Sequence, residues 1–329
     1  MKAYKYRSGI SAGEDIFERD VNTMFENKIY APDKDNLNDP MECLIDDRNL
    51  ITSLSSDVRF VKVREAYWGF KDKIASSGIF SLSRSFTNEI LWSNYSNSHS
   101  GFCIEYDTET IKDSLNYNEY VKLLFNVNVD YNDIPIIDIN SFKEIYNDSD
   151  KMIQIYLGTK TKKWENEEEI RLVFDKFGLY EIDYRAITSI YFGCRMQDDQ
   201  INFIMEKMKG RGLKYYKMEM IPNQYGLNRI PLEDKFSDAE PYFANNLDYD
   251  ANAWWLTKEY MGETYVYKDK LIEALDIVKK EPLIKEIYQA SIIKATIPII
   301  KIFTYTNNRI APVKIFQFKI DCRGEIVKI

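Results

Sequence analysis

Two glutamates separated by one residue stand at the start of an apolar stretch. Glu167 and Glu169 lie in WENEEEIRLVF, and strand alternation places both carboxylates on one side while Ile170 and Leu172 face elsewhere. Repulsion between two close carboxylates raises the pKa of one, which can carry a proton, while the other stays ionised and stabilises positive charge. The pair therefore predicts a catalytic site, and a solvated acidic edge is the alternative interpretation.

Two serines and an arginine are the next candidates. Ser81 and Ser83 share one face of the expected strand GIFSLSRS, where they hold a ribose or phosphate or simply bond to neighbouring backbone. Arg7 ends the alternating segment AYKYR and suits bidentate phosphate or carboxylate binding, with a surface ion pair as the alternative. The candidate catalytic residues are thus Glu169, Glu167, Arg7 and Ser81.

Further side chains in these segments are candidates for contact with a substrate. They are Tyr6, Trp92, Tyr95, His99, Trp164 and Arg171, together with Arg7, Ser81 and Ser83. His99 is the single histidine, which excludes HExxH sites, three-histidine zinc sites and Cys2His2 fingers. A serine hydrolase would need His99, but no GxSxG motif accompanies it, and neither GxxxxGK[ST] nor GxGxxG occurs. No metal is expected.

Composition narrows the class of protein. The chain has 44 Lys and Arg against 52 Asp and Glu, a net charge of -8, which disfavours non-specific nucleic-acid binding. The four cysteines are far apart and match no zinc spacing, so we expect buried reduced thiols. The first residues lack a secretory apolar stretch and charges interrupt every apolar run, so we expect a cytoplasmic protein without a membrane partner.

The elements that must position these residues indicate an α+β fold. Alternation predicts strands over residues 3–8, 78–85, 100–107, 169–174, 187–193 and 214–221. Helices are expected over 12–26, capped by Ser11, over 198–210 and over 268–280, with helix resuming from residue 283. A hairpin over 297–320 closes the chain. Residues 222–249 carry turn residues and little periodicity, which places a boundary near residue 222. This gives a core domain over 1–222 with the candidate site and a C-terminal extension of helices and hairpin over 223–329.

Several segments, taken in order, resemble a known family. They are YKYRS, NDPMEC, FSLS, LWSNY, HSGFCIEYD, KKWENEEEIRLVF and ITSIYFG. Their order resembles the bacterial domain-of-unknown-function 2971 family over residues 1–221, and this family has no general assigned activity.

Three of these pieces also resemble the ADP-ribosyltransferase superfamily, in which a first-strand arginine, a Ser-x-Ser and a Glu-x-Glu occur in this order. The resemblance implies a twisted, mostly antiparallel split sheet with flanking helices, and NAD as the substrate. It further implies that Arg7 grips the phosphates, Ser81 steadies the nicotinamide ribose, Glu169 bonds the ribose 2′-hydroxyl, and Glu167 orients the acceptor. The sequence SLS lacks the threonine that is common in that motif.

The leading hypothesis is an enzyme that cleaves NAD at the nicotinamide–ribose bond, by transfer to a protein or nucleic acid or by hydrolysis, as a toxin or antiphage-defence effector. A non-enzymatic sensor or interaction module of a bacterial defence system is the first alternative. A magnesium-dependent nuclease that uses Asp39, Glu42, Glu105, Glu167 or Glu169 is the second. The acceptor, a homo-oligomer and a defence-system partner are left open.

Overall fold

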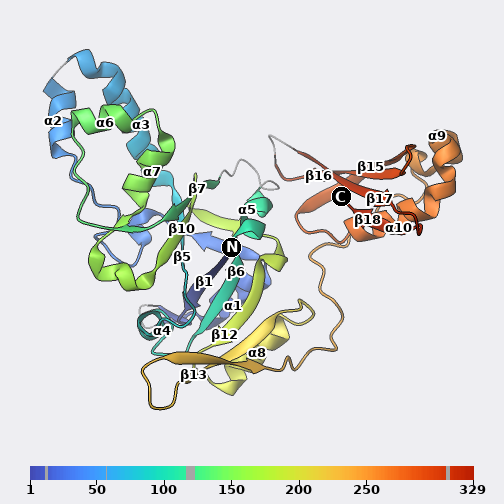
Figure 1. Ribbon diagram of the computed structural model, residues 1–329, viewed down its shortest axis with the longest axis horizontal. Coiled ribbons are helices and arrows are strands. Elements are labelled where there is room, and N and C mark those ends of the chain that lie inside the picture. Colours follow the sequence, from blue (N-terminus) through green and yellow to red (C-terminus); the bar gives the residue numbers. More distant parts are fainter. Residues whose placement is uncertain (12–13, 57, 116–122, 309–311) are drawn as a thin grey trace.

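The computed structural model describes residues 1–11, 14–56, 58–115, 123–308 and 312–329. A central sheet, a helical lobe beside it and a second, smaller sheet make up the structure (Figure 1). The predicted α+β class is confirmed.

Eight strands form the central sheet, in the order β14-β13-β12-β6-β1-β5-β10-β7. Only β12 and β13 run parallel among the pairs of this sheet, so it is mostly antiparallel as predicted. The bounds are β1 Lys2–Arg7, β5 Gly78–Ser83, β6 Phe102–Asp107, β7 Leu123–Asn128, β10 Glu169–Phe174, β12 Ile187–Phe192, β13 Lys214–Met220 and β14 Leu227–Leu232.

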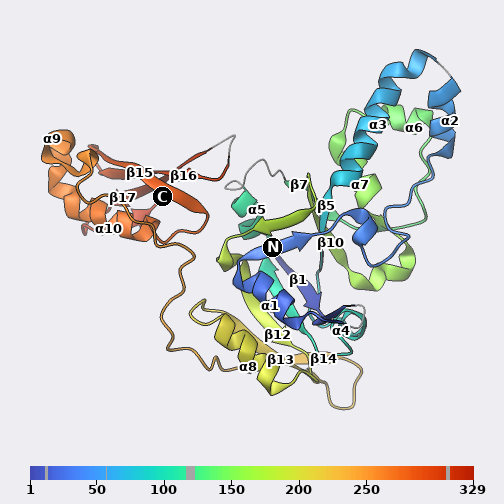
Figure 2. The same cartoon turned by 180° about the vertical axis from the view of Figure 1, so that it is seen from behind.

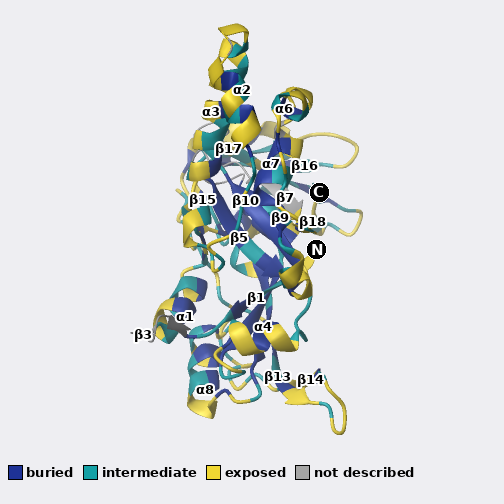
Figure 3. Cartoon of the chain, turned by 90° about the vertical axis from the view of Figure 1, so that its left-hand side faces the viewer, coloured by how far each residue is buried: buried dark blue, intermediate teal, exposed yellow. Residues whose placement is uncertain are grey.

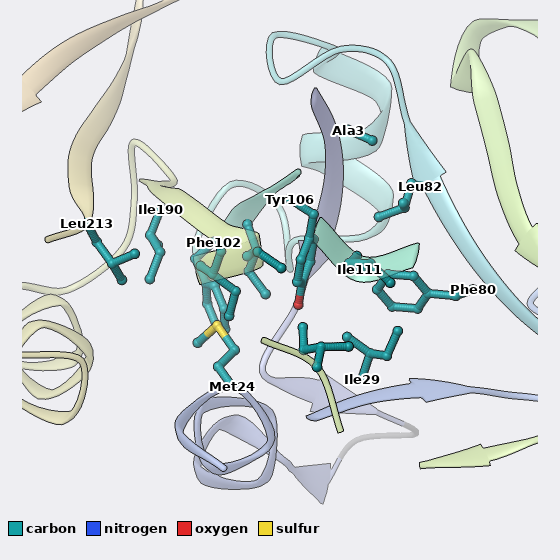
Figure 4. Packing of buried hydrophobic residues seen from close by; sticks show 14 of the residues in the cluster. Ala3, Met24, Ile29, Phe80, Leu82, Phe102, Tyr106, Ile111, Ile190 and Leu213 are labelled. Carbon is teal, nitrogen blue, oxygen red and sulfur yellow. The ribbon is translucent and has the colours of Figure 1, made fainter. Parts of the chain in front are cut away.

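One face of this sheet is apolar because alternate residues of each strand point to it. Phe102, Ile104 and Tyr106 of β6 lie there beside Phe80 and other buried residues of one large cluster (Figure 4). The helices α1 (Phe17–Phe25), α5 (Thr108–Leu115) and α8 (Asp198–Lys207) add buried side chains to this cluster. In α8, two aspartates in the first turn and Lys207 in the last complement the helix dipole.

The opposite face carries the helical lobe and the candidate site. The lobe consists of α2 (Arg48–Ser56), α3 (Val61–Ser76), α6 (Ile139–Ile145) and α7 (Ser149–Leu157), and α4 (Glu89–Asn94) packs nearer β1. The lobe buries its own apolar cluster and joins the sheet through Ile79 and Val173. Its outer helices are largely exposed, while the strands beneath are buried (Figure 3).

Short elements connect these layers. They are the strand pairs β2 (Ile10–Ser11) with β3 (Glu14–Asp15), β4 (Lys28–Ala31) with β11 (Gly178–Glu181), and β8 (Asp130–Tyr131) with β9 (Thr159–Lys160), and the 3-10 helices η1 (Lys34–Asn36), η2 (Val58–Phe60), η3 (Lys162–Glu167) and η4 (Tyr184–Ala186).

The second sheet is built from β15 (Ile284–Ile293), β16 (Ile299–Thr306), β17 (Val313–Ile320) and β18 (Ile326–Lys328). Helix α10 (Lys268–Val278) packs against it, and η5 (Trp254–Leu256), α9 (Lys258–Met261) and η6 (Gly262–Tyr267) precede that helix. This unit has its own buried cluster and stands apart from the central sheet (Figure 2). An ion pair of 2.8 Å between Arg185 and Glu281 links the two.

Three expectations about the elements are wrong. The helix predicted over 12–26 begins at Phe17, because Ser11 belongs to β2 and pairs with β3 instead of acting as a cap; residues 12 and 13 lie outside the described residues. Strand β14 lies in a stretch that was expected to consist of turns. The helix expected from residue 283 is strand β15.

The error at β15 has a clear cause. Register shifts interrupt its pairing with β16 between Ile284 and Glu286 and between Ile287 and Gln289. Each shift adds a residue, so Ile284, Ile287 and Ala290 are buried at a spacing of three, which resembles a helix. The predicted hairpin is confirmed as β16 and β17, although part of its turn lies outside the described residues.

The remaining expectations concern the cysteines, the domain boundary and the membrane. All four cysteines are free; Cys103 is buried as expected, whereas Cys322 is exposed. The boundary near residue 222 stays a prediction, although β14 still pairs with β13 of the central sheet beyond it. Within the described parts of the chain, no helix combines the length and the apolar character that crossing a membrane requires.

We predict that Gly101→Ala destabilises the protein by about 2 kcal/mol or more, because overpacking into backbone leaves little room to relax. A Cβ at Gly101 would lie 2.1 Å from the carbonyl oxygen of Arg7 on the neighbouring strand. The matched control is Gly69→Ala in α3, where a Cβ meets nothing within 4 Å and a gain of about 1 kcal/mol is expected. Urea unfolding measures both, and equal effects would contradict the packing argument.

Candidate functional site

The pairing of β5 with β10 brings the predicted hydroxyls and one carboxylate together. Glu169 is the register partner of Ser83, and Arg171 is the partner of Ser81. Because paired residues share a face of a sheet, these four side chains leave the apolar face and point toward the helical lobe. The hydroxyl of Ser83 donates to the backbone carbonyl of Glu167 at 2.8 Å, which fixes the approach to β10.

A residue in the left-handed backbone conformation brings the carboxylate of Glu167 close to that of Glu169. Glu167 ends η3, and Glu168 follows with φ of 46°, before β10 begins at Glu169. This turn leaves Glu168 exposed while both neighbouring glutamates are buried. The two carboxylates therefore converge as predicted, but through a turn and not through alternation along one strand.

The ammonium group of Lys160 lies at the centre of the site. Its Nζ is 2.9 Å from Glu42 Oε1, 2.5 Å from Glu167 Oε2 and 3.0 Å from Glu169 Oε2. The side chains of all four residues are at most 8% exposed. Lys160 was not among the residues predicted for the site, and only its place in β9, next to the turn before η3, brings it there.

Arg171 is the second cation of this network and is completely buried. Its Nε donates to Glu169 Oε1 at 2.7 Å, one terminal nitrogen bonds Glu42, and the other donates to the carbonyl of Leu157 at 2.9 Å. Arg171 thus holds the carboxylates of Glu169 and Glu42 in place.

Burial and the neighbouring positive charges have opposite effects on the pKa of Glu169. Burial alone would raise the pKa of its carboxyl, but Arg171, Lys160 and a hydrogen bond from Ser81 lower that pKa to about 2. Burial likewise opposes the charged form of Lys160, and the surrounding glutamates raise its pKa above the usual value. Glu169 therefore stays ionised at neutral pH.

Tyrosine hydroxyls complete the polar shell. The hydroxyl of Tyr95 donates to Glu167 Oε1 at 2.6 Å and accepts from the Asn38 side chain at 3.2 Å. Burial and the bond to Glu167 raise the pKa of Tyr95, so its phenol stays protonated. Tyr131 accepts a bond of 2.7 Å from the backbone nitrogen of Glu169.

Most of these groups, but not Arg171 or Tyr131, line a cavity of about 190 Å³. Its wall includes Tyr4, Tyr6, Tyr95, Asn36, Asn38, Ser81, Ser83, Glu42, Lys160, Glu167 and Glu169. The cavity lies where β1 and β5 separate. Tyr4 with Ser83 is the one register pair between these strands, whereas six pairs join β1 to β6.

Lys5 occupies the gap between the two strands and lines the cavity. Its Nζ donates to the carbonyl of Ser81 at 2.8 Å and lies 5.3 Å from the centre of the Phe80 ring. No carboxylate of the described residues forms an ion pair with it. Burial, and then the positive charge of Arg7, lower the pKa of Lys5 to about 7. The sequence pattern gave no signal for this role, because Lys5 alternates with tyrosines in the same way as Arg7.

The structure places other predicted residues away from the cavity. Arg7 is not part of its wall and lies 3.9 Å from Asp20, so the phosphate-binding role implied for Arg7 has no support from its position. Trp92 is buried behind Tyr6, with ring centres 5.2 Å apart, and its Nε1 donates to the carbonyl of Phe86. Trp164 lies beside the network, and the centre of its ring is 5.1 Å from the Nζ of Lys160.

His99 is also outside the cavity wall, in the loop before β6. Its ring is stacked on Trp92, and burial lowers its pKa. Its buried Nδ1 has no hydrogen-bond partner among the described residues. Contact between His99 and a ligand in this cavity therefore has no geometric support.

The carboxylates of the magnesium hypothesis are not gathered around an open point. Lys160 occupies the position on which Glu42, Glu167 and Glu169 converge. Asp39 accepts from Trp164 Nε1 at 2.8 Å, and Glu105 accepts from Tyr191 at 2.7 Å on another part of the sheet. The described ranges contain no group of three or more His, Cys, Asp or Glu side chains suited to a metal ion.

Residues 91–172 match the model of a family described as a protein of unknown function, DUF2971. The match supports the resemblance to this family over the segment from α4 to β10, which includes Tyr95, Lys160, Glu167, Glu169 and Arg171. No curated protein and no solved structure is significantly similar to the chain. The ADP-ribosyltransferase resemblance stays a prediction.

We predict that Lys160→Met lowers the free energy of unfolding at pH 7 by about 3–5 kcal/mol, since it leaves buried carboxylates with one cation. The loss should shrink as pH falls from about 4.5 toward 2. In that window Glu169, whose pKa is lowered to about 2, loses the stability that its ionised form contributes to the native protein.

Urea unfolding at pH 7 and at about pH 3, inside this window, measures this difference. Lys163→Met is the matched control, because Lys163 is exposed on η3, three residues after Lys160, and should leave stability nearly unchanged. A pH-independent loss in Lys160→Met would contradict the proposed charge balance.

Proposed function

We propose that the cavity between β1 and β5 cleaves the bond between nicotinamide and ribose in NAD, by hydrolysis or by transfer to a macromolecular acceptor. The observation that carries the proposal is the cross-strand pairing of Glu169 with Ser83, beside Ser81 and Glu167, in one cavity. An enzyme that consumed the dinucleotide in this way would suit the role of a toxin or antiphage effector.

The charges of the network suit this reaction. Three buried carboxylates face two cations, Lys160 and Arg171, so one negative charge is uncompensated within the network. When the C–N bond breaks, its electron pair neutralises the nicotinamide nitrogen and the ribose carries the positive charge. A fixed anion in a water-excluded site stabilises such a cation more than it stabilises the starting state. Water or an acceptor group then adds to the ribose and releases a proton.

Each residue has a defined part in this proposal. Glu169 accepts a hydrogen bond from a ribose hydroxyl and stabilises the cation, while Ser81 and Ser83 line the ribose position. Glu167, held by Tyr95 and Lys160, orients the incoming acceptor. Because the cavity of about 190 Å³ is smaller than the roughly 300–1,000 Å³ of sites that enclose a whole ligand, it would hold only one end of the dinucleotide, namely the nicotinamide, its ribose and the adjoining phosphate.

Lys5 replaces Arg7 as the first-strand cation in this proposal. It lines the cavity and has no carboxylate partner among the described residues, so a phosphate of the dinucleotide can become its counter-ion.

The first test is Glu169→Gln, which should reduce nicotinamide release at least about 100-fold, the scale of losing one electrostatic stabiliser. Two carboxylates would then face two cations, so the network stays balanced in charge and the variant should fold. Chromatography of released nicotinamide measures the rate.

Glu168→Gln is the matched control, because its carboxylate is adjacent but exposed, and it should retain full activity. A folded Glu169→Gln protein that consumes the dinucleotide at the native rate would contradict the assignment.

The second test concerns Lys5. We predict that a non-hydrolysable carbocyclic analogue of NAD binds progressively more weakly between pH 6 and pH 9, because the pKa of Lys5 is about 7 and deprotonation removes its charge. A bound phosphate raises that pKa, so the midpoint should lie above 7. Calorimetric titration measures the affinity.

Lys5→Arg should remove most of this pH dependence, since a guanidinium stays charged throughout the range. Lys5→Met should bind weakly at every pH, and Lys2→Arg on the same strand is the control. A native protein whose affinity does not change with pH would contradict the role of Lys5.

A non-enzymatic ligand sensor is the second candidate, and one observation favours it. Both oxygens of Glu42, Glu167 and Glu169 already have partners within the chain, as expected of a structural ion-pair network. A sensor would bind the carbocyclic analogue with the same dependence on Lys5 but release no nicotinamide from NAD. Binding and turnover measured on the native protein therefore separate the two functions.

A further inference from the structure

The side chain of Lys5 places an amine at a fixed point of the cavity wall. Tyr4 and Ser83 form the one register pair between β1 and β5, and in the gap beside this pair the Nζ of Lys5 donates to the carbonyl of Ser81 at 2.8 Å. The side chain is half-buried and lines the cavity. The amine is thus accessible from the cavity, and its hydrogen bond is to a neutral group.

The surroundings of Lys5 favour the neutral amine over the ammonium ion. Lys160 contacts three carboxylates, whereas Lys5 forms no ion pair with a carboxylate of the described residues. Burial has the largest effect and Arg7 the next, and together they lower the pKa of Lys5 to about 7. The other ionisable groups around it are Glu169, Asp20 and Glu167, which raise this pKa by less, and Tyr4, Tyr6, Glu42, Tyr95 and Lys160 of the cavity wall.

A neutral amine is a nucleophile, whereas an ammonium ion is not. At pH 7.5 an ordinary lysine is neutral in about 0.1% of molecules, and a pKa of about 7 raises this fraction several hundred-fold. Lysines that are desolvated, or that lie next to another cation, form Schiff bases with carbonyl compounds for this reason. Lys5 has both features, because it is desolvated and lies close to Arg7.

We propose that Lys5 forms a reversible Schiff base with a small hydroxylated aldehyde that enters the cavity. The nitrogen adds its electron pair to the carbonyl carbon, and one proton moves from the nitrogen to the oxygen. The second proton of the nitrogen then leaves with that hydroxyl group as water, and a C=N bond forms. The step needs no oxidant, reductant or cofactor. It goes beyond the cleavage of NAD and does not depend on it.

The cavity wall determines the class of aldehyde. Its hydroxyl and amide groups suit a ligand that carries hydroxyl groups of its own, and they belong to Ser81, Ser83, Tyr95, Asn36 and Asn38. The volume of about 190 Å³ lies below the roughly 300–1,000 Å³ of sites that enclose larger ligands, so the aldehyde should have a short carbon chain.

Reductive trapping on the full-length native protein tests the proposal. Brief treatment with glycolaldehyde and cyanoborohydride at pH 7.5 should convert Lys5 to its hydroxyethyl derivative at least about 100-fold faster than the exposed Lys163. Mass spectrometry with peptide fragmentation distinguishes Lys5 from Lys2 and from the amino terminus. In denaturant the two lysines should react at similar rates, because only the folded protein buries Lys5.

The ratio of the two rates should change with pH. It should be largest near and below pH 7 and should fall as pH rises toward 10, where ordinary lysines also become neutral. Arg7→Gln should lower the ratio several-fold at pH 7.5, because it removes a positive charge that favours the neutral amine. Arg19→Gln is the matched control, since Arg19 also pairs with Asp20 but is exposed and outside the cavity wall.

Two results would overturn the proposal. One is a Lys5 that reacts no faster than Lys163 in the native protein, and the other is a ratio of rates that does not change with pH. Trapping requires no NAD, so it succeeds or fails independently of nicotinamide release.

Discussion

The ammonium group of Lys160 is held by three buried glutamates, and the candidate site depends on this arrangement. A single buried carboxylate carries a large desolvation cost, and three of them close together would repel one another as well. Lys160 and Arg171 offset both effects and fix the carboxylate oxygens in place. The same contacts explain why Glu169 stays ionised inside the protein. The network also connects β9, β10 and the loop that carries Glu42.

The cavity exists because two neighbouring strands separate. Beyond Tyr4 and Ser83, β1 and β5 lose their pairing, and the side chain of Lys5 bridges the gap to the carbonyl of Ser81. A continuous sheet would close this opening and leave Lys5 no access to the network. The segment from η1 to Glu42 and helix α4 then border the opening, so the site is partly enclosed.

Much of the central sheet was predictable, because residues that alternate between an apolar face and a polar face show a period of two in the sequence. The strands that carry Arg7, Ser81 and Glu169 were all predicted from this pattern, whereas the approach of the serines to the glutamate pair was implied only by the resemblance to ADP-ribosyltransferases. Prediction failed at β15, where register shifts space the buried residues like those of a helix. It also failed for the helix over 12–26, because a local strand pair takes the residue expected to cap it.

Local pattern and composition were enough to predict most strands of the central sheet, the residue types available for chemistry, and the exclusion of histidine-based metal sites. Which cations meet the carboxylates depends on the fold. Lys160 and Lys5 reach the site through β9 and through the gap beside β1, whereas Arg7 turns toward Asp20. Strand order and separation are set by long-range packing, and no local pattern in one sequence encodes which side chains will meet across them.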